Sequence, residues 1–382
     1  MKAMKDFLTM VKKLYHRNYE DSMEAIKEQQ IPCAYFYPME PFASGNIDAV
    51  REWGMNVTTI CTWDKNVGEI NYPACRVVGL KEFLSDPREV KIMLLHPQMW
   101  LPVLDKVLAP LGVDSINLGH LQDAINIRDF IFDNLPRLYE TYACLGQEES
   151  KKSYLAAIAG NVSWQIRDYH FAPEPQYMLE SFIPQEDDIA IDGGAYDGGT
   201  ARLFASLGAK VYAFEMDRRN YEVCQAKAEQ YGFVVENMGL SNVEADAHYN
   251  SGGTASCKLD HGAEKAHFIS VDAYVERANL PRVDYIKLDV EGAEREVLEG
   301  AAASILKWKP KMAISAYHRP YDLWDLREYV SALCPSYRFE FRHYPIDVTD
   351  YWLSEQDKAL LREYGLGYKI PTSCETVLYC CS

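Results

Sequence analysis

The residues best suited to chemistry follow short apolar runs, and the first group lies within Ile189–Thr200. There a β-branched run ends in Asp192 and enters a glycine-dense turn that opens a helix. Glycines let the backbone pass close to a ligand, because no Cβ intervenes and φ is unrestricted. An acid at the strand tip favours a ligand with a positive group. We therefore predict that this turn binds a small cofactor.

Two cofactors suit these glycines. The spacing Gly193-x-Ala195-x-x-Gly198 also satisfies a loosened dinucleotide fingerprint. Asp192 would repel a pyrophosphate but attract the ammonium of S-adenosyl-L-methionine, so the acid favours the methyl donor. The residues expected to hold it here are Asp192, Gly193, Gly194, Ala195, Tyr196 and Gly198.

A second acid, Glu215, ends the next predicted strand. A carboxylate at that position can accept both hydroxyls of a ribose, as adenosine-binding α/β sheets require. This holds for either cofactor, so Glu215 leaves both alternatives open. Met216 follows it, and Gly239 and Leu240 lie at the exit of the third strand, where we expect the adenine edge.

The third group follows the later strands. Asp289 ends one buried run, Glu291 comes two positions later, and His318 lies just past the next run. These side chains could orient an acceptor hydroxyl or take its proton, and we predict His318 or Asp289 as the base. The acids could also simply cap the helix that begins near Gly292. We expect no metal site, since Asp289 and Glu291 have no evident third ligand.

The elements that position these groups predict an α/β fold. Runs at 189–192, 210–215, 233–237, 283–288, 312–317, 337–344 and 376–381 read as strands, with helices between most of them. This alternation is typical of a doubly wound, Rossmann-like sheet, which binds ligands at the carboxyl ends of its strands. We expect this domain to span 176–382.

The first part of the chain predicts a smaller α/β domain over 1–120, joined by a helical connector over 121–175. Its strands are expected at 33–37, 56–61 and 90–95, with helices at 47–53 and 100–111. Asp64 follows the second strand and could imitate a ribose-binding acid, but the first strand is followed by no glycine-rich loop. A structural or docking role is therefore favoured over nucleotide binding.

Composition and charge exclude some classes of binding partner. The formal charge of −17 over 382 residues argues against a nucleic-acid substrate, because phosphate binding requires a basic surface. No apolar stretch is long enough to span a bilayer, and residues 1–18 read as an amphipathic helix docked on its own protein. Scattered cysteines such as Cys33, Cys61 and Cys380 read as reduced, buried thiols of a cytoplasmic protein.

Four segments in order resemble the FkbM-type methyltransferases: Asp192–Gly198, the strand ending at Glu215, Tyr285–Glu294, and Arg342–Tyr344 with Glu375–Tyr379. The resemblance covers roughly residues 180–382. It implies a class I methyltransferase fold and S-adenosyl-L-methionine-dependent O-methylation of a sugar, polysaccharide or natural product. It also implies that Asp192 and Glu215 hold cofactor, that Asp289 lies near the reacting centre, and that a separate N-terminal α/β domain is common.

One segment departs from that family. A short turn is usual between the last two strands, but here residues 345–373 intervene, with a helix expected around 355–364. Long insertions between paired strands are often functional. We expect this one to cover the acceptor site or to form a contact between copies of the chain.

Two other functions remain open on the sequence. An NAD-dependent sugar oxidoreductase could use the same glycine turn, although no Tyr-x-x-x-Lys or cysteine pair is evident. A non-catalytic scaffold that retains the cofactor pocket is the third hypothesis. The expected partner is a small-molecule or glycan acceptor, and a homo-oligomer is compatible with the sequence.

Overall fold

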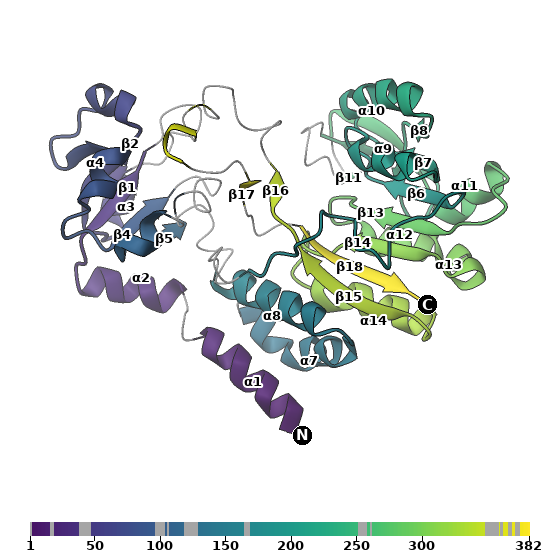
Figure 1. The fold of residues 1–382 in the computed structure, drawn as a ribbon, viewed down its shortest axis with the longest axis horizontal. Helices are drawn as coiled ribbons and strands as arrows, with labels where there is room; N and C mark the ends of the chain where they lie inside the picture. The colour runs from purple at the N-terminus through teal and green to yellow at the C-terminus, as the bar shows by residue number, and fades with distance from the viewer. Residues whose placement is uncertain are drawn as a thin grey trace. The chain divides into compact units, whose positions relative to one another are not determined.

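The computed structural model describes residues 2–15, 19–37, 47–95, 104, 107–117, 129–163, 169–250, 258–259, 262–347, 359, 362–365, 369–370 and 375–382. The chain divides into two compact units. The first comprises 1–135, 155–170 and 345–374, and the second comprises 136–154, 171–344 and 375–382. Figure 1 labels the helices and strands.

The first unit contains a parallel sheet of five strands in the order β3-β2-β1-β4-β5. Its strands are β1 (Cys33–Phe36), β2 (Val57–Thr62), β3 (Arg76–Gly79), β4 (Ile92–Leu95) and β5 (Asp114–Asn117). Its helices are α1 (Lys2–Tyr15), α2 (Tyr19–Glu28), α3 (Ile47–Glu52) and α4 (Leu80–Ser85), with short 3-10 helices η1 (Asp64–Glu69) and η3 (Ala109–Leu111). The predicted α/β domain is thus present, and β3 and β5 are strands that the apolar pattern missed.

The insertion groups with this first unit. Its short strands β16 (Ile346–Asp347) and β17 (Lys369–Ile370) pair antiparallel. The ring of Tyr364 lies 5.4 Å from that of Trp63, and its hydroxyl donates to Asp64. Within the predicted helix at 355–364, the described residues Ala359, Arg362 and Glu363 are helical. The placement of Tyr364 is the physical reason that the insertion belongs with the N-terminal sheet.

The second unit contains a sheet of seven strands in the order β15-β18-β14-β13-β6-β7-β8. Its strands are β6 (Ile189–Gly193), β7 (Lys210–Phe214), β8 (Val234–Glu236), β13 (Tyr285–Leu288), β14 (Lys311–Ser315), β15 (Arg338–His343) and β18 (Thr376–Cys381). Strands β6, β7, β8, β13 and β14 run parallel, whereas β18 is antiparallel to β14 and β15. The predicted doubly wound, Rossmann-like α/β sheet is confirmed.

Helices connect and cover these strands. They are α7 (Leu135–Cys144), α8 (Glu148–Ser163), α9 (Gly199–Ser206), α10 (Arg218–Tyr231), α11 (Val271–Arg277), α12 (Glu294–Gly300), α13 (Ala302–Trp308) and α14 (Asp322–Leu333). The helix expected to begin near Gly292 is divided into α12 and α13. Helices α7 and α8 lie in the predicted connector, but α7 belongs to the second unit and α8 is divided between the two.

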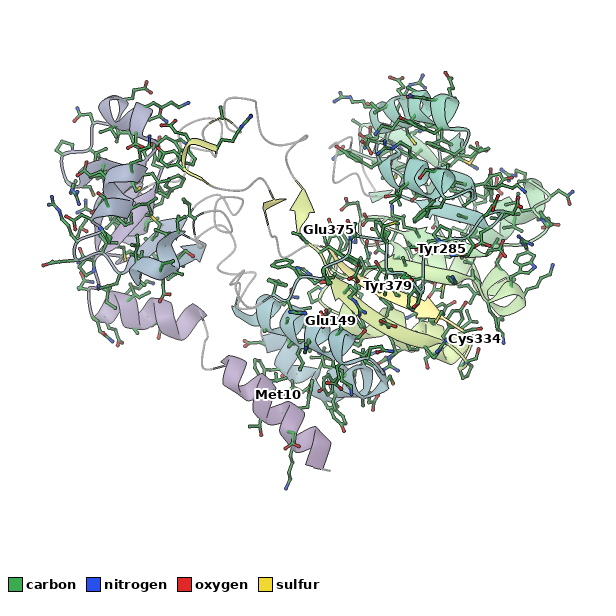
Figure 2. All side chains as sticks on the ribbon, in the orientation of Figure 1. Met10, Glu149, Tyr285, Cys334, Glu375 and Tyr379 are labelled. Carbon is green, nitrogen blue, oxygen red and sulfur yellow. The ribbon has the colours of Figure 1, made fainter. Side chains whose placement is uncertain are left out.

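A small side sheet was not predicted. It has the order β11-β10-β12-β9, formed by β9 (Gly239–Leu240), β10 (Ala245–Tyr249), β11 (Lys258–Leu259) and β12 (Glu264–Ile269). The core of the second unit is rich in aromatic rings, including Tyr285 on β13 and Tyr379 on β18, both labelled in Figure 2 and both fully buried.

The structure also bears on the predicted cysteines, the N-terminal helix and the membrane. Cys33, Cys61 and Cys380 are free thiols buried in β1, β2 and β18, as predicted. Phe7 and Val11 of α1 are fully buried, consistent with a helix docked on its own protein. Among the described residues, no helix is long and apolar enough to cross a membrane.

Candidate active site

The glycine turn after β6 is held by backbone contacts to the next strand. The N–H groups of Gly194 and Ala195 both donate to the carbonyl of Phe214, at 3.0 and 2.9 Å. Gly194 has φ +73°, and a Cβ placed there would come within 1.8 Å of the Asp289 carbonyl oxygen. Only glycine fits this position, because the turn lies directly against the end of β13.

Lys287 fixes the same turn from inside the sheet. Its Nζ lies 3.0 Å from Asp192 Oδ1 and donates to the carbonyls of Gly194 and Gly193, at 2.7 and 3.3 Å. These three contacts match the three donors of an ammonium group. Burial opposes the charge, but Asp192 and Asp289 raise the pKa of Lys287 above its usual range. Lys287 is therefore a buried cation that locks the turn.

Asp192 already has a cationic partner within the chain. The sequence suggested that its charge attracts a cationic ligand, but Asp192 is fully buried and its cation is Lys287. Burial is the largest influence on Asp192, and it raises the pKa of that carboxyl. Direct contact between Asp192 and a cofactor stays a prediction, and the charge of Asp192 gives it no support because Lys287 balances that charge.

Glu215 lies just past β7 with its carboxylate turned toward the glycine turn. Oε2 accepts from the N–H of Tyr196 and Oε1 from that of Asp217, both at 2.8 Å. Burial raises the pKa of Glu215 to about 7, against the lowering effect of these two donors. A carboxylate has about four lone-pair positions, so two remain for ligand hydroxyls. Contact between Glu215 and a ribose stays a prediction.

The remaining predicted cofactor contacts have packing roles. Met216 is partly buried against the cluster of Tyr249, Ala266 and Phe268. A Cβ at Gly239 would lie 2.3 Å from the Phe268 ring, and one at Gly193 would lie 2.9 Å from Leu240. Gly239 and Leu240 therefore fit the side sheet to the turn, and their contact with an adenine stays a prediction.

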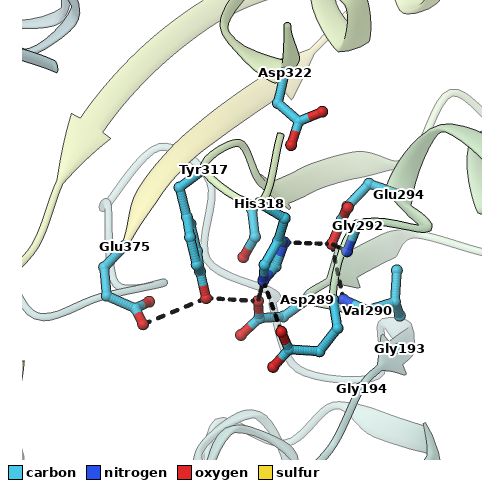
Figure 3. Close-up of polar contacts among 12 residues, drawn as sticks. Gly193, Gly194, Asp289, Val290, Gly292, Glu294, Tyr317, His318, Asp322 and Glu375 are labelled. Atoms are coloured by element: carbon cyan, nitrogen blue, oxygen red, sulfur yellow. Dashed lines mark hydrogen bonds and ion pairs between the residues drawn. The ribbon is translucent and has the colours of Figure 1, made fainter. Parts of the chain in front are cut away.

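The acids after β13 gather around His318, as Figure 3 shows. His318 Nε2 lies 3.7 Å from Asp289 Oδ1 and 3.5 Å from Glu291 Oε2, and Nδ1 lies 2.9 Å from Glu294 Oε1. Glu294, at the start of α12, also accepts the N–H groups of Val290 and Gly292, at 2.9 and 3.4 Å. The turn between β13 and α12 is thus shaped by one buried carboxylate.

The charges of this group decide the protonation of His318. Burial opposes a charged imidazole, yet Glu294, Asp289 and Glu291 raise the pKa of His318 to about 9. At neutral pH the ring is therefore an imidazolium with both nitrogens protonated, and it cannot accept a further proton. Of the two bases predicted from the sequence, the arrangement therefore favours Asp289. Burial raises the pKa of Glu291 to about 7, so this side chain is only partly ionised near neutral pH.

Two tyrosines and a glutamate complete the site. Tyr317 Oη donates to Asp289 Oδ1 at 3.1 Å and lies 3.4 Å from Glu375 Oε1, while Tyr177 Oη lies 3.4 Å from Asp289 Oδ2. Glu375 immediately precedes β18. The sequence analysis assigned no role to these two tyrosines or to Glu375, and none to Lys287 or Glu294. Lys287, Glu294 and Glu375 stand inside the segments that carried the family resemblance, which was the available signal.

A metal ion was not expected at this site. One potential ligand atom each from Asp289, Glu294 and His318 lies within 4.8 Å of the others. In this arrangement the imidazolium supplies the positive charge among the carboxylates. The absence of a metal from the working site stays a prediction.

The comparisons with known proteins bear on the family and the fold. Residues 192–343 match the family described as the Methyltransferase FkbM domain, a span that begins at Asp192 and includes Glu215, Asp289 and His318. A crystal structure of Methyltransferase FkbM from Methylobacillus flagellatus superimposes with a TM-score of 0.68, covering 99% of both chains at 18% identity. At that identity the likeness shows the fold alone.

A curated relative is similar over a shorter stretch. The hexuronic acid methyltransferase AglP of Haloferax volcanii is 30% identical over 145 residues, which is 36% of this chain and 59% of that protein. The chain thus spans a little under three fifths of the length of this relative.

Proposed function

We propose that this chain, which belongs to the FkbM methyltransferase family, transfers a methyl group from S-adenosyl-L-methionine to a hydroxyl of a sugar, polysaccharide or natural product. The observation that carries the proposal is the common location of three groups. The glycine turn, Glu215 and Asp289 all lie at the carboxyl ends of neighbouring parallel strands, within the span that matches the family. Ligands of open α/β sheets bind at this edge.

The residues of the turn would hold the cofactor. Glu215 would accept the ribose hydroxyls through its remaining lone pairs, and the close approach at Gly194 would let the backbone line the site. When bound, the cofactor supplies a methyl carbon activated by a sulfonium. An in-line displacement then needs mainly alignment of the acceptor oxygen and exclusion of water.

Asp289 would take the proton of the acceptor hydroxyl. Its carboxylate is held by two phenol groups, from Tyr317 and Tyr177, and is partly exposed. His318 Nε2 lies 3.7 Å from Asp289 Oδ1, so the imidazolium would hold this carboxylate in place beside the acceptor. A positioned base of this kind contributes ~10²–10⁴-fold to the rate.

A sugar hydroxyl is the acceptor that we favour. The support is the similarity to a hexuronic acid methyltransferase and the suitability of a carboxylate base for an uncharged hydroxyl. Among the described residues, no contact favours the sequence-based alternatives, a sugar oxidoreductase and a scaffold.

The test is incubation of the full chain with methyl-labelled S-adenosyl-L-methionine and a panel of neutral and acidic sugars, followed by identification of labelled product. We expect a methyl ether and an equal amount of S-adenosylhomocysteine. Label recovered only as a methyl ester or methylamine would contradict O-methylation of a hydroxyl. No transfer to any sugar or extract glycan, with the cofactor bound, would favour the scaffold.

A further inference from the structure

Glu375 lies beside the candidate base although 86 positions separate it from Asp289 in the sequence. The antiparallel pairing of β14 with β18 explains this, because Ser315 lies opposite Val377. The residue just before β18 therefore faces the loop just after β14. In Figure 3, Tyr317 bridges Glu375 and Asp289.

The single O–H of Tyr317 cannot make hydrogen bonds to two ionised carboxylates at once. A phenol has a single O–H, and an ionised carboxylate can only accept. Tyr317 Oη is within hydrogen-bonding distance of both Asp289 Oδ1 and Glu375 Oε1, at 3.1 and 3.4 Å. It can donate to only one of them. Both contacts are hydrogen bonds only when one of the two carboxyl groups carries a proton.

Glu375 is held in position at a conformational cost. Its φ is +74°, a left-handed backbone conformation that non-glycine residues rarely adopt. Its carbonyl accepts the N–H of Tyr344 at 3.1 Å, and Gln176 Nε2 donates to Oε2. These contacts leave Oε1 directed toward Tyr317.

We propose that Glu375 receives, through Tyr317, the proton that Asp289 takes from the acceptor hydroxyl. The inference rests on the proposed function. As the acceptor oxygen bonds to the methyl carbon and the carbon–sulfur bond breaks, the hydroxyl proton passes to Asp289. Asp289 then gives a proton to the Tyr317 oxygen while the Tyr317 O–H gives its own to Glu375. Asp289 is ionised again, and Glu375, which is partly exposed, releases the proton to water.

The surroundings of Glu375 suit this role. The titratable and charged groups that face it include Asp289 and Lys287 of the β13 segment, Tyr317 and His318 after β14, and Tyr177 before β6. Burial and the charge of Asp289 raise the pKa of Glu375 to about 7, while Gln176, His318 and Lys287 oppose that rise. A group of this pKa can both take and release a proton near neutral pH.

Infrared difference spectroscopy tests the proton sharing without any acceptor. A pH titration of the full chain is expected to show carboxylic-acid C=O bands that appear as the pH falls through about 7, from Glu375 and from the other carboxyl groups with a raised pKa, Glu215, Glu291 and Asp322. Glu375→Gln removes one of these bands, and Tyr317→Phe shifts the frequency of that same band because the hydrogen bond is lost. The matched control is Glu229→Gln on the exposed face of α10, which leaves all of the bands unchanged. A full set of bands that Glu375→Gln leaves intact, or a Glu375 band that does not shift in Tyr317→Phe, would overturn the proposal.

Kinetics separate this inference from the proposed function. For Glu375→Gln we expect kcat to fall about 10-fold or more with KM for both substrates nearly unchanged, and the rise of kcat with pH near 7 to disappear. Tyr317→Phe should cost about as much, and the double variant little more than either single change. A wild-type chain that methylates sugars alongside a Glu375→Gln variant of equal kcat would refute the relay alone. Absence of methylation by the wild type, with intact folding and cofactor binding, would refute the function and the relay together.

Discussion

Both units carry an acid just after the second strand of a parallel sheet, and the two acids are used differently. In the second unit, Glu215 accepts two backbone N–H groups from its own surroundings and keeps lone pairs for a ligand. In the first unit, Asp64 accepts the hydroxyl of Tyr364, and its own N–H donates back to that hydroxyl at 3.2 Å. A side chain of the insertion thus takes the position at Asp64 that a ribose hydroxyl takes in dinucleotide folds.

The comparison shows that topology alone does not make a binding site. The first sheet has the order of the first five strands of a dinucleotide-binding fold, yet its acid is engaged by Tyr364 packed on Trp63. The second sheet adds a glycine turn, in which Gly194 lies so close to the Asp289 carbonyl that no Cβ would fit. We therefore propose that the chemistry takes place at the second sheet.

The largest expected effect is at the candidate base. Asp289→Asn keeps the shape but removes the proton acceptor, so kcat should fall by ~10²–10⁴-fold while cofactor affinity changes little. Steady-state methyl transfer and calorimetry on the same preparation check both values. A variant with turnover within about twofold of wild type would remove Asp289 from this role.

Next comes the glycine turn. Gly194→Ala would place a methyl 1.8 Å from the Asp289 carbonyl oxygen, so the turn must move and cofactor affinity should fall by at least ~100-fold, about 2.7 kcal/mol. The control is Gly232→Ala at the end of α10, where φ is +78° and the methyl meets open space. That change should cost about 1 kcal/mol of stability and no affinity. Equal loss of affinity in both variants would mean that general destabilisation, rather than the turn, is responsible.

The two acids can be compared by the same substitution. Glu215→Gln should weaken S-adenosyl-L-methionine about 10- to 100-fold, as expected when a hydrogen bond to a charged acceptor is lost. Asp64→Asn should leave that affinity unchanged. Calorimetric titration of both variants measures the difference, and matched losses would show that the units are not functionally distinct.

The pH dependence of affinity should follow Glu215. Its pKa of about 7 lies above the ordinary value, so the carboxylate that accepts ribose hydroxyls is lost as the pH falls below 7. Affinity for the cofactor should therefore be greater at pH 8 than at pH 6, by up to roughly tenfold. Glu215→Gln should flatten this dependence. A cofactor affinity that rises as the pH falls from 8 to 6 would contradict this prediction.

The smallest effect concerns the insertion. Tyr364→Phe removes the hydroxyl from Asp64, which should lower the free energy of unfolding by about 1–2 kcal/mol and leave kcat unchanged. Denaturant titration followed by assay is the check. Phenylalanine keeps the ring on Trp63, so only the polar contact is tested. A loss of turnover without a loss of stability would give the insertion a role in catalysis.

The sequence was sufficient to predict the strands and the turn that position the site. The buried run before Asp192, the glycines after it and the acid after β7 are local patterns with local causes. Strands β3 and β5 were missed because neither is a continuous apolar run. Arg76–Gly79 begins with an arginine and ends with a glycine, and Asp114–Asn117 carries polar residues despite its place in a parallel sheet.

The contacts that set the chemistry could not be predicted in the same way. Lys287 is a buried cation only because β6 places Asp192 opposite it. The sequence indicated His318 as a base. In the structure, three carboxylates of the segment 289–294 surround it and raise its pKa to about 9. Glu375 reaches Tyr317 through a strand pairing, which no spacing along the chain encodes.

The central claim, that the glycine turn and Glu215 of the second unit hold a methyl donor, is tested most directly by calorimetric titration of the full chain with S-adenosyl-L-methionine and, in parallel, with NAD. We predict saturable binding of S-adenosyl-L-methionine that Glu215→Gln weakens and Asp64→Asn does not, with no heat from NAD. Saturable binding of NAD with none of S-adenosyl-L-methionine would contradict it.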